Sequence, residues 1–247
     1  MYILKAQNLV KRYGGRTVVD QVSFDVSEGE IVGLLGRNGA GKTTSFRITI
    51  GMITPEDGQI IFNGQEVSRL PMFQRARRGM GYLSQEPSVF QRLTVEQNLL
   101  AILETRLGLT RREQLHRSEQ LMAQFNLTTN RRQQARTLSG GERRKLEIAR
   151  ALITEPSLLL LDEPFSGVDP KTIEDLQKEI RRLREEHHIA MLVTDHQVER
   201  TLEIVDRGYI IADGRVIFDG TPKQIINDPR VRALYLGSTF KGDEFDE

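Results

Sequence analysis

The chain of 247 residues contains no cysteine. It therefore has no disulfide bridges and no metal sites built on thiolates, and it is compatible with a reducing cytoplasm.

Its charges almost cancel, because 35 lysine and arginine residues stand against 34 aspartate and glutamate residues. Binding to nucleic acid usually requires a clustered basic face, so we expect no nucleic-acid partner. Pairs of arginines are scattered among glutamate and glutamine, and we interpret them as solvated helix faces. These pairs begin at Arg77, Arg111, Arg131, Arg143 and Arg181.

Long apolar segments are also missing. Purely aliphatic runs such as Leu158–Leu161 are short, whereas about 20 apolar residues are needed to cross a bilayer. The first residues, MYILKAQNLVKRYGG, lack the apolar stretch and the small-residue cleavage site of a signal peptide. We therefore expect no direct membrane insertion, so any role at a membrane must depend on a partner.

What the chain does contain is a pattern of alternating strands and helices. The first third alternates strand-like segments with tight turns such as Asn63-Gly64. Residues 94–127 show helical periodicity, and both Thr94 and Thr110 are followed three residues later by Gln or Glu, as in a capping box. A strand at 158–161, a helix from Pro170 and a second strand then predict a parallel sheet. The expected fold class is therefore α/β.

The segment GRNGAGKT, residues 36–43, is a complete phosphate-binding loop. It lies between the apolar strand EIVGLLG and a helical stretch, which is the context that such a loop requires. Its backbone N–H groups can wrap the β-phosphate, Lys42 can reach the β and γ oxygens, and the Thr43 hydroxyl can ligate Mg²⁺. The predicted nucleotide-binding residues of this loop are Gly36, Arg37, Asn38, Gly39, Ala40, Gly41, Lys42, Thr43 and Thr44.

Two carboxylates follow the buried-type strand LLLL. At the end of such a strand, Asp162 and Glu163 are costly unless they serve a cation or a proton. Asp162 suits Mg²⁺, and Glu163 suits polarisation of an attacking water molecule. A pair of this kind can also simply end a strand. It is the presence of the phosphate-binding loop in the same chain that favours the catalytic interpretation.

Three further side chains are candidates for the site. His196 follows the strand IAMLVTD, so it emerges at the same carboxyl edge of a parallel sheet and can contact the γ-phosphate; alternatively, it is structural. Gln85 in GYLSQEP can touch Mg²⁺ or water, or it is a plain turn residue. Tyr13 in KRYGG either stacks on a purine or fills the core.

These motifs, with LSGGE at 138–142 and SGVDP at 166–170, resemble in their order the ATP-binding subunits of ABC transporters. The resemblance spans nearly the whole chain. It implies a P-loop NTPase with a RecA-like core, an antiparallel β subdomain and an inserted helical subdomain. It also implies that two copies sandwich two ATP molecules head to tail. Ser139, Gly140 and Gly141 would then hold the γ-phosphate of the ATP bound by the partner copy, and Asp169 would join the nucleotide contacts.

The same resemblance predicts how the chain is divided. Residues 1–247 would form one ABC ATPase domain, with the core and β subdomain in residues 1–86 and 146–222. The helical subdomain would span residues 87–145, and a C-terminal helix with an acidic tail would occupy residues 223–247.

Within the family, several phrases, including the late YLG, resemble both the ATPases of lipopolysaccharide export and those of branched-chain amino-acid importers, and residues 81–95 favour the exporter. This similarity implies an ATPase that powers lipopolysaccharide extraction and export from the cytoplasmic face of the inner membrane. Integral membrane subunits would dock near Gln85 to Val95. An importer ATPase and an ABC protein outside transport are the alternatives. Arg37 and Ser84 stand where the family commonly has proline.

Phe90 lies between the loop that carries Gln85 and the capped helix that begins near Thr94. It can be an apolar anchor for a membrane subunit, or it can fill the core of the helical lobe. Sequence leaves both interpretations open, because anchors and core aromatics look alike.

Overall fold

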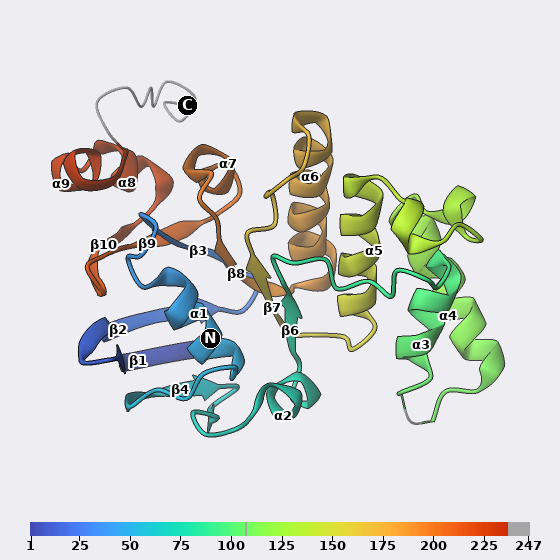
Figure 1. Ribbon diagram of the computed structural model, residues 1–247, viewed down its shortest axis with the longest axis horizontal. Helices are drawn as coiled ribbons and strands as arrows, with labels where there is room; N and C mark the ends of the chain where they lie inside the picture. Colours follow the sequence, from blue (N-terminus) through green and yellow to red (C-terminus); the bar gives the residue numbers. More distant parts are fainter. Residues whose placement is uncertain (107, 237–247) are drawn as a thin grey trace.

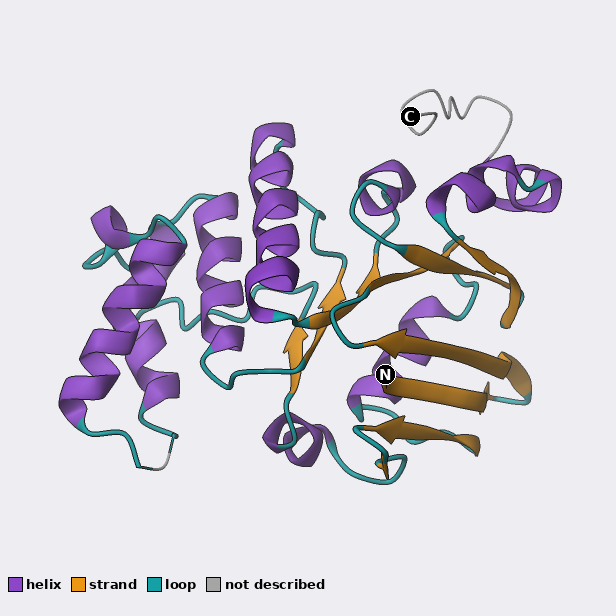
Figure 2. Cartoon of the chain, turned by 180° about the vertical axis from the view of Figure 1, so that it is seen from behind, coloured by secondary structure: helices purple, strands orange, loops and turns teal. Residues whose placement is uncertain are grey.

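The computed structural model describes residues 1–106 and 108–236, and it contains two β-sheets with helices around them (Figure 1). The predicted acidic end GDEFDE lies outside the described residues. Seen from behind, the strands gather toward one end of the molecule and the longest helices toward the other (Figure 2). The predicted α/β class is confirmed.

The larger sheet has six strands in the order β10-β9-β3-β8-β7-β6, and all but β10 run parallel to their neighbours. Strands β3, β7 and β8 are buried along their whole length, which explains their unbroken apolar sequences. The strands are β3 (Ile31–Gly36), β6 (Met80–Leu83), β7 (Leu158–Asp162), β8 (Ala190–Thr194), β9 (Arg207–Ala212) and β10 (Arg215–Gly220).

The smaller sheet is antiparallel, in the order β2-β1-β4-β5. The Asn63-Gly64 turn joins β4 to β5 with φ angles of 49° and 73°, as a two-residue hairpin requires. This sheet and the larger one enclose an apolar cluster to which α1 contributes Phe46, Ile48 and Ile50. Its strands are β1 (Tyr2–Tyr13), β2 (Arg16–Ser27), β4 (Asp57–Phe62) and β5 (Gln65–Glu66).

Helices α3 and α4 form the helical lobe, and both begin with the predicted capping boxes at Thr94 and Thr110. Helix α5 starts at the capping box of Ser139 and continues to Leu152, across the boundary expected at residues 145 and 146. This helix therefore connects the lobe to the core, and the division into subdomains stays a prediction. The helices are α1 (Lys42–Ile50), α2 (Met72–Arg77), α3 (Val95–Leu103), α4 (Arg111–Gln124), α5 (Gly140–Leu152), α6 (Pro170–His187), α7 (Val198–Leu202), α8 (Pro222–Asn227) and α9 (Pro229–Val231).

Helix α6 has the amphipathic face that its spacing predicts. Ile173, Leu176, Ile180 and Leu183 are all buried, and Pro170 occupies the first turn, where its missing N–H costs nothing. His187, the last residue of the helix, is exposed. The helix therefore covers one face of the larger sheet next to α5 (Figure 1).

A buried arginine stabilises the far end of the helix that follows the phosphate-binding loop. Arg75 of α2 donates hydrogen bonds to Ile48 O (2.7 Å) and Thr49 O (2.6 Å), the last carbonyls of α1. It also donates to Leu70 O and Ser68 O, both at 2.9 Å. Burial lowers its pKa to about 10, so the guanidinium stays charged at neutral pH. A cation at a helix C-terminus favours the helix dipole, so α2 helps to hold α1 in place.

Candidate nucleotide-binding site

The loop between β3 and α1 has the backbone that a phosphate-binding loop needs. Gly36 and Gly41 have φ angles of 150° and 107°. A Cβ at Gly36 would lie 2.2 Å from Ile211 O, and one at Gly41 would lie 2.6 Å from Val18 O. Only glycine therefore fits either position. Gly39, by contrast, has open space around its Cα, so an anion can approach the backbone there.

Lys42 begins α1 and reaches back across the loop. Its ammonium donates hydrogen bonds to Gly36 O and, at 2.9 Å, to Arg37 O. Burial lowers the pKa of Lys42, while the negative charges of Glu163 and Asp195 act in the opposite direction. The cation therefore lies at the mouth of the loop, where it can meet the charge of a phosphate.

Asp162 ends β7 as a buried carboxylate. Its Oδ2 accepts a hydrogen bond from Tyr82 Oη at 3.3 Å. Burial raises the pKa of Asp162, and the nearby Glu163 raises it further. Burial and the neighbouring Asp162 raise the pKa of Tyr82 to about 12. Tyr82 was not predicted as part of the site, because a tyrosine inside a short strand carries no signal in sequence.

The Mg²⁺ ligands expected from the sequence are oxygen donors: the Thr43 hydroxyl, the Gln85 amide oxygen and the Asp162 carboxylate. Oxygen ligands are the kind that Mg²⁺ prefers, usually together with substrate phosphates and water. Within the part of the chain that the structure describes, no group of three or more His, Cys, Asp or Glu residues could hold a metal alone. The residues present therefore fit an ion bound jointly with a nucleotide.

Glu163, Gln85 and His196 meet at the carboxyl ends of adjacent strands. Glu163 Oε2 accepts a hydrogen bond from Gln85 Nε2 at 2.7 Å and lies 3.4 Å from His196 Nδ1. Glu163 has a φ of 46°, in the left-handed region that a glutamate seldom adopts. Its N–H donates to Thr194 O at 2.7 Å, which fixes this turn to β8. The structure thus brings together three residues that the sequence nominated separately.

Asp195 is a member of this cluster that the sequence analysis missed. It is fully buried, and its carboxylate lies 3.4 Å from His196 Nδ1. Burial raises its pKa, and backbone N–H groups of Gln197 and Phe165 partly offset that effect. Its position directly before His196 was the one feature of the sequence that could have pointed to it.

The LSGGE segment lies on the far side of β7 and α6 from α1 (Figure 1). Ser139 and Gly140 are exposed, and the Ser139 hydroxyl donates to Glu142 Oε2 at 2.8 Å. A Cβ at Gly141 would lie 2.4 Å from Thr172 Cγ2, so glycine there lets α5 approach α6. Asp169 caps α6 by accepting a hydrogen bond from Thr172 N at 3.1 Å. Gly141 is thus buried between the two helices, whereas Ser139, Gly140 and Asp169 are exposed.

The wall of the loop also includes residues from the two ends of the chain. An open hollow of about 270 Å³ is lined by Arg16, by Arg37–Ala40 and by Tyr235. Burial raises the pKa of Tyr235 to about 12, and the negative charge of Asp195 acts in the same direction. Tyr13 ends β1 and is 48% exposed, so it is not a core residue. Its ring is therefore available for stacking.

The segment on both sides of Gln85 is bonded to α5. Arg144 donates to Ser84 O at 2.8 Å, and Glu147 accepts from Ser88 N at 2.8 Å. Arg144 and Glu147 also bond each other at 2.9 Å, and both are buried. The interpretation of the arginine pairs as solvated faces was therefore wrong for Arg144, because this loop and β7 cover it.

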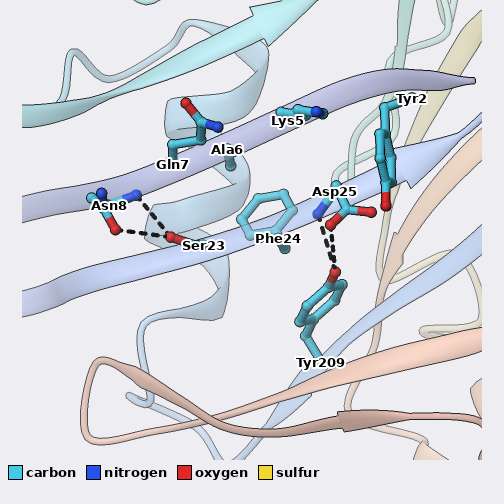
Figure 3. A pocket seen from close by; sticks show the side chains of 9 residues that line it. All are labelled: Tyr2, Lys5, Ala6, Gln7, Asn8, Ser23, Phe24, Asp25 and Tyr209. Atoms are coloured by element: carbon cyan, nitrogen blue, oxygen red, sulfur yellow. Dashed lines mark hydrogen bonds between the residues drawn. The ribbon is translucent and has the colours of Figure 1, made fainter.

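A second hollow, of about 470 Å³, lies over β1 and β2 beside β9 (Figure 3). Two pairs of its polar groups bond each other: Ser23 Oγ accepts from Asn8 N at 2.8 Å, and Tyr209 Oη donates to Asp25 Oδ2 at 3.1 Å. The structure describes every site residue predicted from the sequence, and none of them lines this hollow. The phosphate-binding loop is therefore the better candidate for the functional site.

The strand, glycine loop and helix of residues 31–50, with carboxylates and a histidine on neighbouring strand ends, define a P-loop nucleotide-binding protein. Comparison with known proteins makes the assignment narrower. The ABC transporter family matches residues 19–166, and the branched-chain amino acid ATP-binding cassette transporter family matches residues 215–241.

Several relatives cover almost the whole chain. The lipopolysaccharide export system ATP-binding protein LptB of Haemophilus influenzae is 48% identical over 241 residues, covering 98% of this chain and 100% of that protein. LptB of Acidithiobacillus ferridurans is 48% identical over 239 residues, covering 97% and 98%. The solved ADP conformation of MJ1267, an ATP-binding cassette of an ABC transporter, superposes with a TM-score of 0.85 at 28% identity, covering 96% and 99%.

The chain belongs to the ABC transporter family as an ATP-binding protein, and it is an ATPase. The expected cassette fold is confirmed by the solved relative. Nucleotide binding follows from the family. Among the described residues, no helix is both long enough and apolar enough to cross a bilayer.

Proposed function

We propose that this ATPase powers the extraction of lipopolysaccharide from the inner membrane and its export. The observation that carries the proposal is the similarity to two proteins named for the lipopolysaccharide export system. The chain is 48% identical to each of them over nearly the whole length. Location on the cytoplasmic face of the inner membrane, held there by membrane subunits, is part of the same proposal.

Hydrolysis would use the cluster at the strand ends. Glu163 would accept a proton from the attacking water, with Gln85 at 2.7 Å and His196 at 3.4 Å fixing its carboxylate. Lys42 would stabilise negative charge on the β and γ oxygens. Thr43, Gln85 and Asp162 would hold Mg²⁺, which supplies charge neutralisation at the phosphates when it is bound. Tyr13 would stack on the adenine base.

We further propose that two copies of the chain share each ATP molecule. Ser139 and Gly140 are exposed at the N-terminus of α5, where backbone N–H groups and the helix dipole favour an anion. Their position, on the far side of α6 from the phosphate-binding loop, supports contact with the γ-phosphate of a second copy. Asp169, exposed at the start of α6, would lie at the same interface.

Membrane subunits would dock on the segment from Gln85 to Val95. Phe90 is 43% exposed rather than part of the core, and its ring stacks under the guanidinium of Arg150 at 4.4 Å. An exposed aromatic side chain on a fixed backbone is typical of an interface anchor. Movement of Gln85 during hydrolysis would reach the membrane subunits through this segment.

A branched-chain amino-acid importer is the second candidate, and the match of residues 215–241 to that transporter family favours it. Purification of the tagged chain from its own membranes in mild detergent, with mass spectrometry of the bound integral membrane subunits, separates the two. We expect subunits of a lipopolysaccharide exporter. Proteoliposomes containing this complex should lose lipopolysaccharide to an acceptor only with ATP, and a Glu163→Gln complex should retain it. Importer subunits in the purified complex would overturn the proposed cargo.

A further inference from the structure

Asp195 connects the two turns that carry the catalytic candidates. Its Oδ2 accepts a hydrogen bond from Phe165 N at 3.2 Å, two residues after Glu163. Its Oδ1 accepts from Gln197 N at 2.8 Å, directly after His196. Gln197 Nε2 donates in turn to Phe165 O at 3.3 Å. One carboxylate thus supports both the turn after β7 and the turn after β8.

The same carboxylate lies next to the imidazole. His196 Nδ1 lies 3.4 Å from Asp195 Oδ1 and 3.4 Å from Glu163 Oε2, between two carboxylates. This arrangement favours a proton on Nδ1. Because the two ring nitrogens point in divergent directions, Nε2 is turned away from both carboxylates. The orientation of the ring is therefore fixed from its Nδ1 side.

Hydrogen bonds to two turns do not by themselves require Asp195 to be charged. Asp195 is 0% exposed, and burying a carboxylate is costly unless its charge is used. The titratable groups that face it are His196, Glu163, Lys42 and Tyr235. Two of them, His196 and Lys42, are groups that would meet the phosphates.

We propose that Asp195 is a positioning residue for ATP hydrolysis. Its carboxylate orients His196 through Nδ1, so that Nε2 is presented to the nucleotide, and it fixes the turn that carries Glu163. The inference rests on the proposed hydrolytic roles of Glu163 and His196. Its effect is on the chemical step, because Asp195 itself is buried away from the substrate.

The test uses steady-state ATP turnover of the full chain with Asp195→Asn, which keeps the shape and removes the charge. We expect kcat to fall about 10- to 100-fold, the scale for groups that orient a functional histidine. KM for ATP should change less than about twofold, because binding does not depend on His196 orientation. Asp206→Asn is the matched control, since Asp206 accepts from Ile31 N at 2.9 Å at the other edge of the same sheet. Asp206→Asn should lower the melting temperature about as much as Asp195→Asn does, but its kcat should stay near that of the wild type.

A double-mutant cycle then separates positioning from general support. In a His196→Ala background, Asp195→Asn should cost much less than in the wild type, because the group through which it acts is gone. An equal fold loss in both backgrounds, or a variant that keeps more than half of kcat, would overturn the inference. If Asp195→Asn does not fold, Asp195→Ser replaces it under the same criteria, since its hydroxyl still accepts a backbone hydrogen bond.

The controls also keep this inference distinct from the proposed function. Wild-type turnover that is lost in Glu163→Gln, together with a normal Asp195→Asn, contradicts only the role of Asp195. A Glu163→Gln chain as active as the wild type contradicts the hydrolytic mechanism itself.

Discussion

Glu163 illustrates how one residue can be strained and held at the same time. A φ of 46° disfavours a side chain with a Cβ, yet the bond from Glu163 N to Thr194 O at 2.7 Å maintains the turn. Gln85 and His196 then fix the carboxylate from two sides. Strain that persists at a cluster of polar groups is typical of a functional site.

We predict that Glu163→Gln preserves ATP binding and lowers turnover by about 100-fold or more, the usual scale for a general base. Carboxylate and amide have nearly the same shape, so the ATP-bound dimer should accumulate. Phosphate release and gel filtration with ATP measure the two effects. Glu185→Gln, an exposed change on α6, is the control. Turnover close to that of the wild type in Glu163→Gln would contradict the role of Glu163.

A second prediction at this scale concerns pH. Burial alone would raise the pKa of Glu30, but hydrogen bonds from Arg207 and from Ser27 N outweigh it and keep the pKa below its ordinary 4.5. A carboxylate with a lowered folded-state pKa stabilises the fold above the unfolded-state pKa, and this stabilisation is lost as the pH falls through the folded-state value. The salt bridge from Arg207 Nε to Glu30 Oε1 spans 2.5 Å and joins β9 to the turn between β2 and β3.

Glu30→Gln should therefore lower the free energy of unfolding at about pH 7, and the difference from the wild type should shrink as the pH drops below about 4.5. Urea unfolding at both pH values checks this. Glu28→Gln, an exposed neighbour, should show a smaller dependence. A difference from the wild type that is the same at both pH values would contradict the prediction.

At the scale of elements, polar contacts from two helices fix the backbone of the loop from Ser84 to Thr94. Asn98 of α3 is fully buried, accepts from Phe90 N at 2.8 Å and donates to Thr94 O at 3.0 Å. Arg150 of α5 donates to Ser88 O at 2.6 Å. The backbone of the loop is therefore held by α3 and α5, while the ring of Phe90 stays at the surface.

Phe90→Ala should leave the melting temperature of the isolated chain nearly unchanged and should abolish assembly with the membrane subunits. Phe125→Ala is the matched control, because Phe125 is buried in the helical lobe. Its truncation should cost about 3–5 kcal/mol. Thermal unfolding and co-purification in detergent measure both. A Phe90→Ala chain that still assembles normally would exclude the anchor role.

At the scale of the whole molecule, the phosphate-binding loop and the LSGGE segment belong to different parts of one chain. Ser139 opens α5 and Lys42 opens α1, and β7 with α6 lies between these helices (Figure 1). In the proposed dimer, a single copy would therefore offer two half-sites. Isolated copies should be slow at low concentration.

Mixing two inactive chains tests this arrangement. Ser139→Arg should bind ATP at its own loop but block the site of its partner, and Lys42→Ala should fail at its own loop. A heterodimer keeps one intact site, formed by the loop of the Ser139→Arg chain and the LSGGE segment of the Lys42→Ala chain. We expect turnover to return on mixing. Loss of ATP binding by Ser139→Arg alone, or no recovery in proven heterodimers, would refute the shared site.

Local chemistry determined a large part of this protein. The strand, glycine loop and Lys42 are contiguous, so the sequence predicted the phosphate-binding loop, and the structure shows its backbone at Gly36 and Gly41. The capping boxes at Thr94 and Thr110 are also local, since each joins residues three apart. Both were predicted and are confirmed.

Tertiary structure decided what depends on contacts between distant segments. Tyr82 bonds Asp162 across 80 positions, and Asp195 bonds Phe165 across 30, so neither partner is visible in a local pattern. Whether Tyr13, Phe90 and Arg144 are buried depends on which elements cover them. An aromatic or charged residue has the same local signature in either case. The residue types of the site were therefore set by the sequence alone, whereas their exposure, their partners and their shifted pKa values arise only when the strands are brought to one edge of the sheet.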